Sequence, residues 1–175
     1  TGISRIEEDK YVWLDRFTIK NLELVSSPHE NARTLSDILD ETQTAMGSRM
    51  LRRWIMLPLK NKKPIEDRLM VVDFFKANEK IGFELSQRLK NIGDLERLIS
   101  KVAVGRVNPK EVAHLKKTLM EIDPLKALLN TNDKPKSLKG LLEKLDPCPK
   151  LIDLIDVSLT EEPAAQIGKG EVIKA

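Results

Sequence analysis

The stretch from residue 42 to residue 59 reads TQTAMGSRMLRRWIMLPL and is the strongest indication of the fold. Its apolar residues recur at helical spacing, which places them on one face of a helix. Leu57-Pro58 then ends that helix, because proline restricts the residue before it and has no backbone N–H to donate. We expect a helix from Met46 to Leu57. Four residues of its apolar face are predicted to anchor it: Met50, Leu51, Trp54 and Ile55.

This stretch and the residues after it also carry a cluster of positive charge. No acidic residue lies between Glu41 and Glu66. The interval contains six basic residues: Arg49, Arg52, Arg53, Lys60, Lys62 and Lys63. Such groups bind phosphates, but arginines beside a tryptophan also pair with carboxylates and cover apolar surface with their stems. The cluster therefore predicts contacts between domains or contacts with nucleic acid, and the lack of interleaved base-stacking residues favours the first.

Composition predicts a mainly α fold, an irregular multi-helical bundle with a small extended N-terminal segment. Among the 175 residues, 41% are hydrophobic and 33% charged, which is typical of a globular protein. Only 4% are aromatic, so the core must be built from aliphatic side chains, and this favours helices. The net charge of +3 does not by itself indicate nucleic-acid binding. No apolar run reaches the ~20 residues that span a bilayer.

The order of capping and breaking residues predicts three parts. Residues 1–33 would form an extended and short-helical segment, with Ile3, Ile6, Tyr11, Trp13 and Leu14 in short strands. Residues 34–159 would form the helical core, and residues 160–175 an extended tail. Thr34 with Asp37, and Asn108-Pro109 with Glu111, are typical of helix starts. We expect a break or kink near Lys80 to Gly82 and a helix interruption at Pro124.

The residues do not predict an enzyme. No GxxxxGK[ST] phosphate-binding loop is present, and no catalytic, cofactor-binding or metal-binding set of residues is predicted. His29 and His114 have no partners spaced as zinc ligands, so structural roles are favoured for both. Cys148, the only cysteine, is interpreted as a packing residue in a reducing cytoplasm.

Several blocks together resemble the central core of the MutS family of DNA mismatch-repair proteins. They occur in the order LDRFTIKNLEL (residues 14–24), HENARTLSDILDETQTAMGSRMLRRWIMLPL (29–59), KPIEDRLMVVDFF (63–75), IGDLERLISKVAVGRVNPKEV (92–112) and IGKGEVIKA (167–175). The order and spacing of the blocks make the resemblance specific, and it covers nearly the whole chain.

The resemblance implies a core or lever segment that transmits conformational change between DNA-binding and ATPase domains. It implies that the full-length protein uses ATP and Mg, forms a homodimer and binds mismatched double-stranded DNA, whereas this segment holds no cofactor. Its other partners would be the connector, clamp and ATPase domains of the same protein. The location would be the bacterial cytoplasm, at the nucleoid when on DNA, with no membrane contact.

The chain resembles a piece of a longer protein, because it begins without methionine and its tail resembles the stretch before the clamp insertion. We therefore expect the isolated fragment to expose apolar surface, and either to self-associate or to pack more loosely in its last third. Two other hypotheses remain open. One is an autonomous helical DNA-binding module that uses the six basic residues, and the other is an unrelated helical interaction scaffold.

Overall fold

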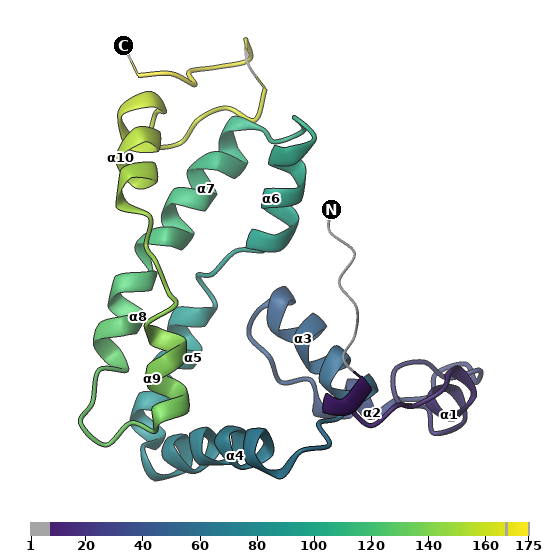
Figure 1. The fold of residues 1–175 in the computed structure, drawn as a ribbon. Coiled ribbons are helices and arrows are strands. Elements are labelled where there is room, and N and C mark those ends of the chain that lie inside the picture. The colour runs from purple at the N-terminus through teal and green to yellow at the C-terminus, as the bar shows by residue number, and fades with distance from the viewer. Residues whose placement is uncertain (1–7, 167, 175) are drawn as a thin grey trace. The chain divides into compact units, whose positions relative to one another are not determined.

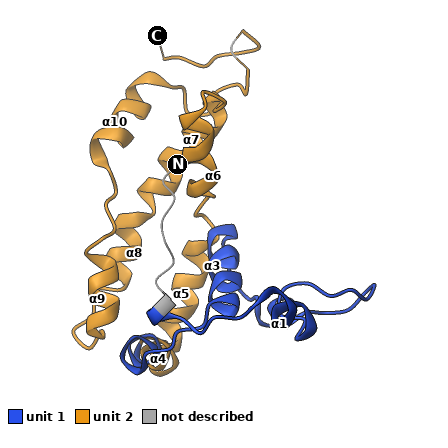
Figure 2. Cartoon of the chain, turned by 45° about the vertical axis from the view of Figure 1, so that its right-hand side comes forward, with its two compact units in different colours: residues 1–70 blue, residues 71–175 orange. Residues whose placement is uncertain are grey.

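A computed structural model describes residues 8–166 and 168–174. The chain divides into two compact units, residues 1–70 and residues 71–175, which are coloured separately in Figure 2 and described separately below. Helices dominate both units, and the described residues contain isolated β-bridges in place of strands. The mainly α fold predicted from the sequence is confirmed. The predicted divisions at residues 33 and 159 stay predictions.

The first unit consists of short helices joined by well-capped turns (Figure 1). Its elements are η1 (Glu8–Lys10), α1 (Arg16–Asn21), α2 (Leu35–Leu39), α3 (Ala45–Met56) and the beginning of α4 (Lys62–Ala77). The strands predicted near the N-terminus are replaced by the 3₁₀ turn η1 and a single bridge between Tyr11 and Leu59. Ile3 and Ile6 lie outside the described residues.

Side-chain caps begin three of these helices. Asp15 accepts a hydrogen bond from the Thr18 amide at 2.7 Å and so begins α1. Thr34 and Asp37 form the predicted capping box of α2, because each side chain accepts from the other residue's backbone N–H. Thr44 accepts from the Gly47 amide at 2.9 Å and begins α3. Each cap satisfies a backbone donor that the first turn of a helix leaves unpaired.

The second unit is a layered helical bundle (Figure 1). It contains the end of α4 and the helices α5 (Glu79–Leu89), α6 (Leu95–Ala103), α7 (Pro109–Met120), α8 (Ile122–Leu128), α9 (Lys136–Leu142) and α10 (Pro149–Ser158). Helix α7 is the central element, because it packs against α6, α8 and α10, and α8 in turn packs against α5.

An apolar core holds this second unit together. Its buried members come from the two helices α4 and α9 and from the residue after α8: Phe74, Leu129, Leu138 and Leu142. Partly buried residues of α4 and α5 pack against them: Val71, Phe75, Ile81 and Leu85. Burial of these side chains stabilises this part of the unit, and further buried apolar residues lie outside the cluster on α6, α7, α8 and α10: Leu98, Leu119, Leu125 and Ile155.

Two predicted helix breaks are displaced in the structure. The first lies at Asn78, not between Lys80 and Gly82, because the Asn78 side chain donates to the Phe74 carbonyl at 2.9 Å and ends α4. Gly82 lies inside α5, with its amide bonded to the Asn78 carbonyl. The second break follows Met120, upstream of Pro124. Proline has no N–H for the carbonyl four residues back, so the hydrogen-bond ladder is interrupted at Met120.

The end of the chain folds back on α10. Leu159 bridges to Ile173, and the Thr160 amide donates to the Val172 carbonyl at 3.0 Å. Val172 is buried, and Lys174 pairs with Asp156 on α10 at 3.6 Å. The described part of the tail is therefore non-helical but attached to the bundle by both polar and apolar contacts.

Candidate functional site

The basic cluster predicted from the sequence lies on α3, on the start of α4 and on the connection between them. Thr44 caps α3 at one end, and the helix ends at Met56 directly before Leu57-Pro58. The predicted helix from Met46 to Leu57 is thus confirmed to within one residue at each end. The proline and its neighbours turn the chain so that Lys60, Lys62 and Lys63 follow Arg53 after a short connection.

Two of the six basic residues are engaged within the first unit. Arg52 donates through Nη2 to the Val25 carbonyl at 3.0 Å. The Thr34 backbone N–H lowers the pKa of the Asp37 carboxyl, and the charge of Arg52 adds to that effect. Lys62 forms an ion pair with Glu66 at 3.4 Å, one helical turn away. Arg52 therefore ties α3 to the segment before α2.

Three other basic residues are available to an external partner. Arg53, Lys60 and Lys63 are exposed, and their side chains have no hydrogen bond or ion pair within the described part of the chain. Arg49 is half-buried and has an interaction of its own. The structure thus divides the predicted cluster into residues that have partners in the chain and residues that have none among the described residues.

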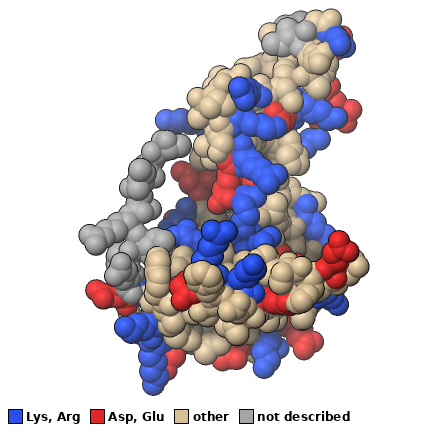
Figure 3. Space-filling view, turned by 90° about the vertical axis from the view of Figure 1, so that its right-hand side faces the viewer, with Lys and Arg blue, Asp and Glu red and all other residues tan. Residues whose placement is uncertain are grey.

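Lys and Arg side chains do not form a uniform positive surface. Figure 3 shows them interspersed with acidic and uncharged side chains on the face that it presents. The small net charge of +3 agrees with that distribution. Nonspecific phosphate binding scales with the number of clustered cations, so any contribution from Arg53, Lys60 and Lys63 depends on their local grouping.

The apolar stripe of α3 is partly exposed in the part of the chain that the structure describes. Met50 is 55% exposed and Trp54 is 42% exposed, whereas Leu51 and Ile55 are half-buried. One face of the Trp54 ring is covered by Arg68 of α4, whose guanidinium carbon lies 3.6 Å from the ring centroid. The anchoring role predicted for these four residues stays a prediction.

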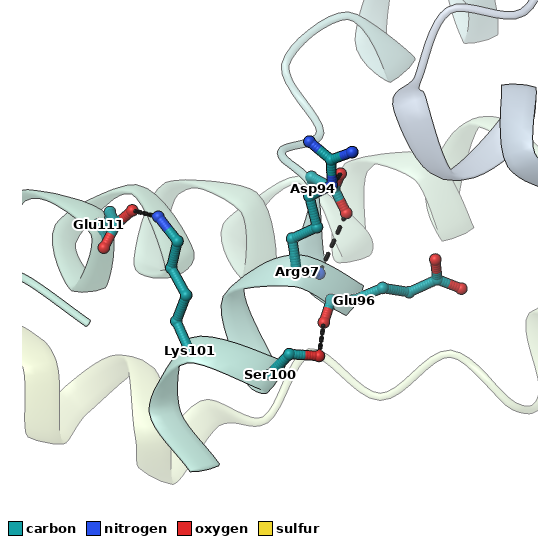
Figure 4. Close-up of polar contacts among 6 residues, drawn as sticks. All are labelled: Asp94, Glu96, Arg97, Ser100, Lys101 and Glu111. Carbon is teal, nitrogen blue, oxygen red and sulfur yellow. Dashed lines mark hydrogen bonds and ion pairs between the residues drawn. The ribbon is translucent and has the colours of Figure 1, made fainter. Parts of the chain in front are cut away.

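A pocket that the sequence did not predict lies between α6 and α7. It encloses about 310 Å³ and is lined by residues of both helices and of the turn before α6: Gly93, Asp94, Leu95, Arg97, Leu98, Lys101, Glu111, His114 and Thr118. Charged groups of opposite sign meet there (Figure 4). Arg97 pairs with Asp94 at 3.6 Å, and Lys101 with Glu111 of α7.

These contacts neutralise the pocket internally. The Lys101 hydrogen bond, followed by the Asn108 backbone N–H, lowers the pKa of the Glu111 carboxyl. The buried Thr118 hydroxyl accepts a hydrogen bond from the Gly93 amide at 3.1 Å. The Gly93–Thr118 hydrogen bond therefore attaches the turn before α6 to α7. The charged side chains Arg97, Asp94, Lys101 and Glu111 that line the pocket are paired with one another. The contacts of Asp94 with Arg97 and of Asn108 with Glu111 are local caps, whereas Lys101–Glu111 and Gly93–Thr118 join separate elements and have no local signal in the sequence.

No reactive constellation emerges from the remaining polar residues. His29 and His114 are both exposed, and His29 lies 3.9 Å from Glu23. Among the described residues, no group of three or more His, Cys, Asp or Glu could hold a metal ion. Cys148 is half-buried, in a left-handed conformation directly before α10. Within the same residues no helix is long and apolar enough to cross a membrane.

Comparison with known proteins identifies the family. The sequence pattern described as MutS domain III matches residues 17–175. The chain belongs to the MutS domain III family. Three relatives are each named DNA mismatch repair protein MutS. The Parabacteroides distasonis protein is 46% identical over 99% of this chain, the Bacteroides fragilis protein 45% over 99%, and the Flavobacterium psychrophilum protein 46% over 100%.

The domain III match begins within α1 and includes α3, the basic cluster and the pocket between α6 and α7. The chain spans 20% of the length of each of these relatives. Similarity that extends over the whole chain means that both units belong to the region shared with these relatives. The MutS resemblance predicted from the ordered sequence blocks is confirmed.

Proposed function

We propose that this chain is the structural core of a bacterial DNA mismatch-repair protein and transmits conformational change between its DNA-binding and ATPase parts. The observation that carries the proposal is the domain III match over residues 17–175, with about 45% identity to the mismatch-repair relatives along the chain. In this proposal ATP, Mg and mismatched double-stranded DNA bind elsewhere in the longer protein. The protein works as a homodimer in the cytoplasm and associates with the nucleoid when on DNA.

The packing of the second unit supports a mechanical role. Helix α7 contacts three neighbouring helices, and the Lys101–Glu111 and Lys116–Asp156 ion pairs tie it to α6 and α10. A displacement applied to one of these helices is therefore resisted by several contacts at once. Transmission over a distance requires such packed elements, which move as units between discrete arrangements.

The test is to loosen one helix connection in the full-length protein. Two glycines inserted after Asn78 separate α4 from α5, while two inserted after Asn132 lengthen the exposed loop between α8 and α9. We expect the first variant to bind mismatched DNA and to hydrolyse ATP, but to lose the change in ATP turnover that mismatched DNA causes. The loop variant should keep that response.

Helical circular dichroism must be equal in both variants for the comparison to hold. Retention of the mismatch response by a well-folded Asn78 variant would contradict transmission through these helices. Loss of the response in both variants would point to a general effect of chain length.

Direct DNA contact by the basic cluster is a second candidate function, favoured by the free side chains of Arg53, Lys60 and Lys63. If all three contact phosphates, replacing them with glutamine should reduce the slope of log Kd against log salt by about 0.9 for each contact. The matched control replaces three exposed lysines of the second unit with glutamine: Lys136, Lys144 and Lys150. Equal slopes in both triple variants, measured by fluorescence anisotropy with a DNA duplex, would exclude specific phosphate contacts by this cluster.

A further inference from the structure

Arg68, which is not one of the six basic residues of the cluster, stacks on the ring of Trp54. It belongs to α4, and its guanidinium carbon is 3.6 Å from the centroid of the Trp54 ring on α3. A planar guanidinium stacks on an indole more favourably than an ammonium does, because its charge is delocalised and weakly hydrated. The pair therefore joins two helices that follow one another in the chain.

The surroundings of Arg68 make Trp54 its principal partner. Arg68 is half-buried, and no carboxylate forms an ion pair with it within the described residues. Partial burial lowers the pKa of the Arg68 guanidinium, and nearby Tyr11 acts in the opposite direction. The arginine remains charged, since its ordinary pKa is far above neutrality. The ring face thus supplies the attraction that a carboxylate supplies to most partly buried arginines.

Backbone hydrogen bonds also hold the connection between α3 and α4, which we call the elbow (residues 57–61). The connection between α3 and α4 runs beside residues 10–12, where the Val12 amide donates to the Pro58 carbonyl at 2.8 Å. The Lys60 amide donates to the Lys10 carbonyl at 3.0 Å. Tyr11, which bridges to Leu59, also lies near Arg68. The stack therefore joins the two helices on either side of the elbow, and the bridge holds the elbow itself.

We propose that the stack of Arg68 on Trp54 is a latch that fixes the angle between α3 and α4, and that releasing it opens the elbow. Trp54 is 42% exposed, so the stack is at the surface and is weak enough to break when α3 is displaced. This inference rests on the proposed function in one respect. The elbow would be the joint at which a displacement of α3 passes to α4.

The test measures the elbow directly in the full-length protein. Arg68→Met keeps the aliphatic stem and removes the guanidinium, while Lys76→Met removes an exposed charge from the same helix as a control. With 5-fluorotryptophan incorporated, the ¹⁹F resonance of Trp54 reports the stack. Trp13, which is 63% exposed, serves as the internal reference.

Amide hydrogen exchange at Val12 and Lys60 reports the elbow. We expect Arg68→Met to shift the Trp54 resonance and to accelerate exchange at both amides by about two- to fivefold, the range given by an exposed cation–π contact. Arg68→Lys should show a smaller acceleration, and Lys76→Met none. A shifted Trp54 resonance with unchanged exchange at both amides would overturn the latch.

A second pair of variants covers the case in which Arg68→Met does not fold. Trp54→Phe retains a ring and should exchange nearly as the parent protein does, whereas Trp54→Leu should exchange faster at Val12 and Lys60. Equal exchange in these two variants would also overturn the latch. The latch is judged on exchange alone and the proposed function on the mismatch response of ATP turnover, so either can fail without the other.

Discussion

The two units of this chain are stabilised by different means. In residues 71–175, buried aliphatic and aromatic side chains of several helices meet in one core around Phe74, Leu129, Leu138 and Leu142. In the described part of residues 1–70, Leu24 is the buried hydrophobic residue, and the other buried side chains there are the polar Thr34 and Ser36. Caps, the Arg52 contact with Val25 and the Arg68 stack hold that unit.

The difference indicates which unit depends on its surroundings. Large apolar side chains face solvent in both units, including Phe17 at 79% exposure in the first and Val157 at 69% in the second, but only the second unit combines them with an extended buried cluster among the described residues. Exposed apolar surface of this kind is typical of interaction sites. Local caps define the shapes of its helices but contribute little to their mutual packing. The second unit therefore has the better basis for independent stability, because its buried side chains form a cluster.

The core of the second unit is the place where one substitution should have the largest effect. Leu138→Ala removes a side chain that is 5% exposed and leaves a cavity, so we expect a loss of about 2–5 kcal/mol in the free energy of unfolding. Leu141→Ala, on the outer face of the same helix at 56% exposure, should change it by less than about 0.5 kcal/mol. Urea denaturation of the chain measures both. Similar losses for the two variants would show that the α9 core is not a source of stability.

A substitution at Gly93, in the turn that packs against α7, should reduce the free energy of unfolding by less, and a second substitution at His114 tests the cause. A Cβ on Gly93 would lie 2.4 Å from His114 Nε2 and 3.1 Å from Thr118 Oγ1. We expect Gly93→Ala to cost about 1–3 kcal/mol through this overpacking, and His114→Ala to restore part of the loss. Gly140→Ala is the control, because nothing lies within 4 Å of its Cβ, and in a helix it should stabilise by about 0.4–1 kcal/mol. If the double variant Gly93→Ala/His114→Ala is as unstable as Gly93→Ala alone, contact with the His114 ring is not the cause of the destabilisation.

These contacts also mark how far the sequence predicts the structure. Caps and stops such as Thr34 with Asp37, or Asn108-Pro109, are local and were predicted correctly, because the interacting groups lie within one turn. The stack of Arg68 on Trp54 and the approach of Gly93 to Thr118 join residues from separate elements, which no local pattern specifies. The displaced break at Asn78 has a similar cause, since glycine propensity at Gly82 was outweighed by a side-chain hydrogen bond that ends α4 earlier.

Removal of one cap from each unit compares their dependence on local contacts. Thr34→Ala and Asn108→Ala each delete one half of a capping box, so each should cost about 1 kcal/mol in local stability. In the second unit, packing of α7 against its neighbours should confine the effect to the first turn of that helix. In the first unit we expect faster amide exchange throughout α2 and at the start of α3. Equally local effects in both units would remove the distinction between them.

Acidification should produce the smallest and most distributed effect, and should loosen the first unit before the second. Backbone amide bonds lower the pKa of Asp15 and Asp37, and the Ser48 hydroxyl, followed by Thr42, lowers that of Asp40. A carboxyl whose pKa is lower in the folded state stabilises the fold above its unfolded pKa, near pH 4, and this stability is lost as pH falls through the folded value. The second unit has such groups in Glu111 and Asp156 but also retains its apolar core at low pH.

Amide resonances of α2 should therefore broaden or shift at a higher pH than those of α9. Asp37→Asn should move the α2 spectrum at pH 6 toward its acid form, whereas Asp133→Asn, in an exposed loop, should not. Simultaneous loss of both sets of resonances would mean that the two units unfold as one despite their different construction.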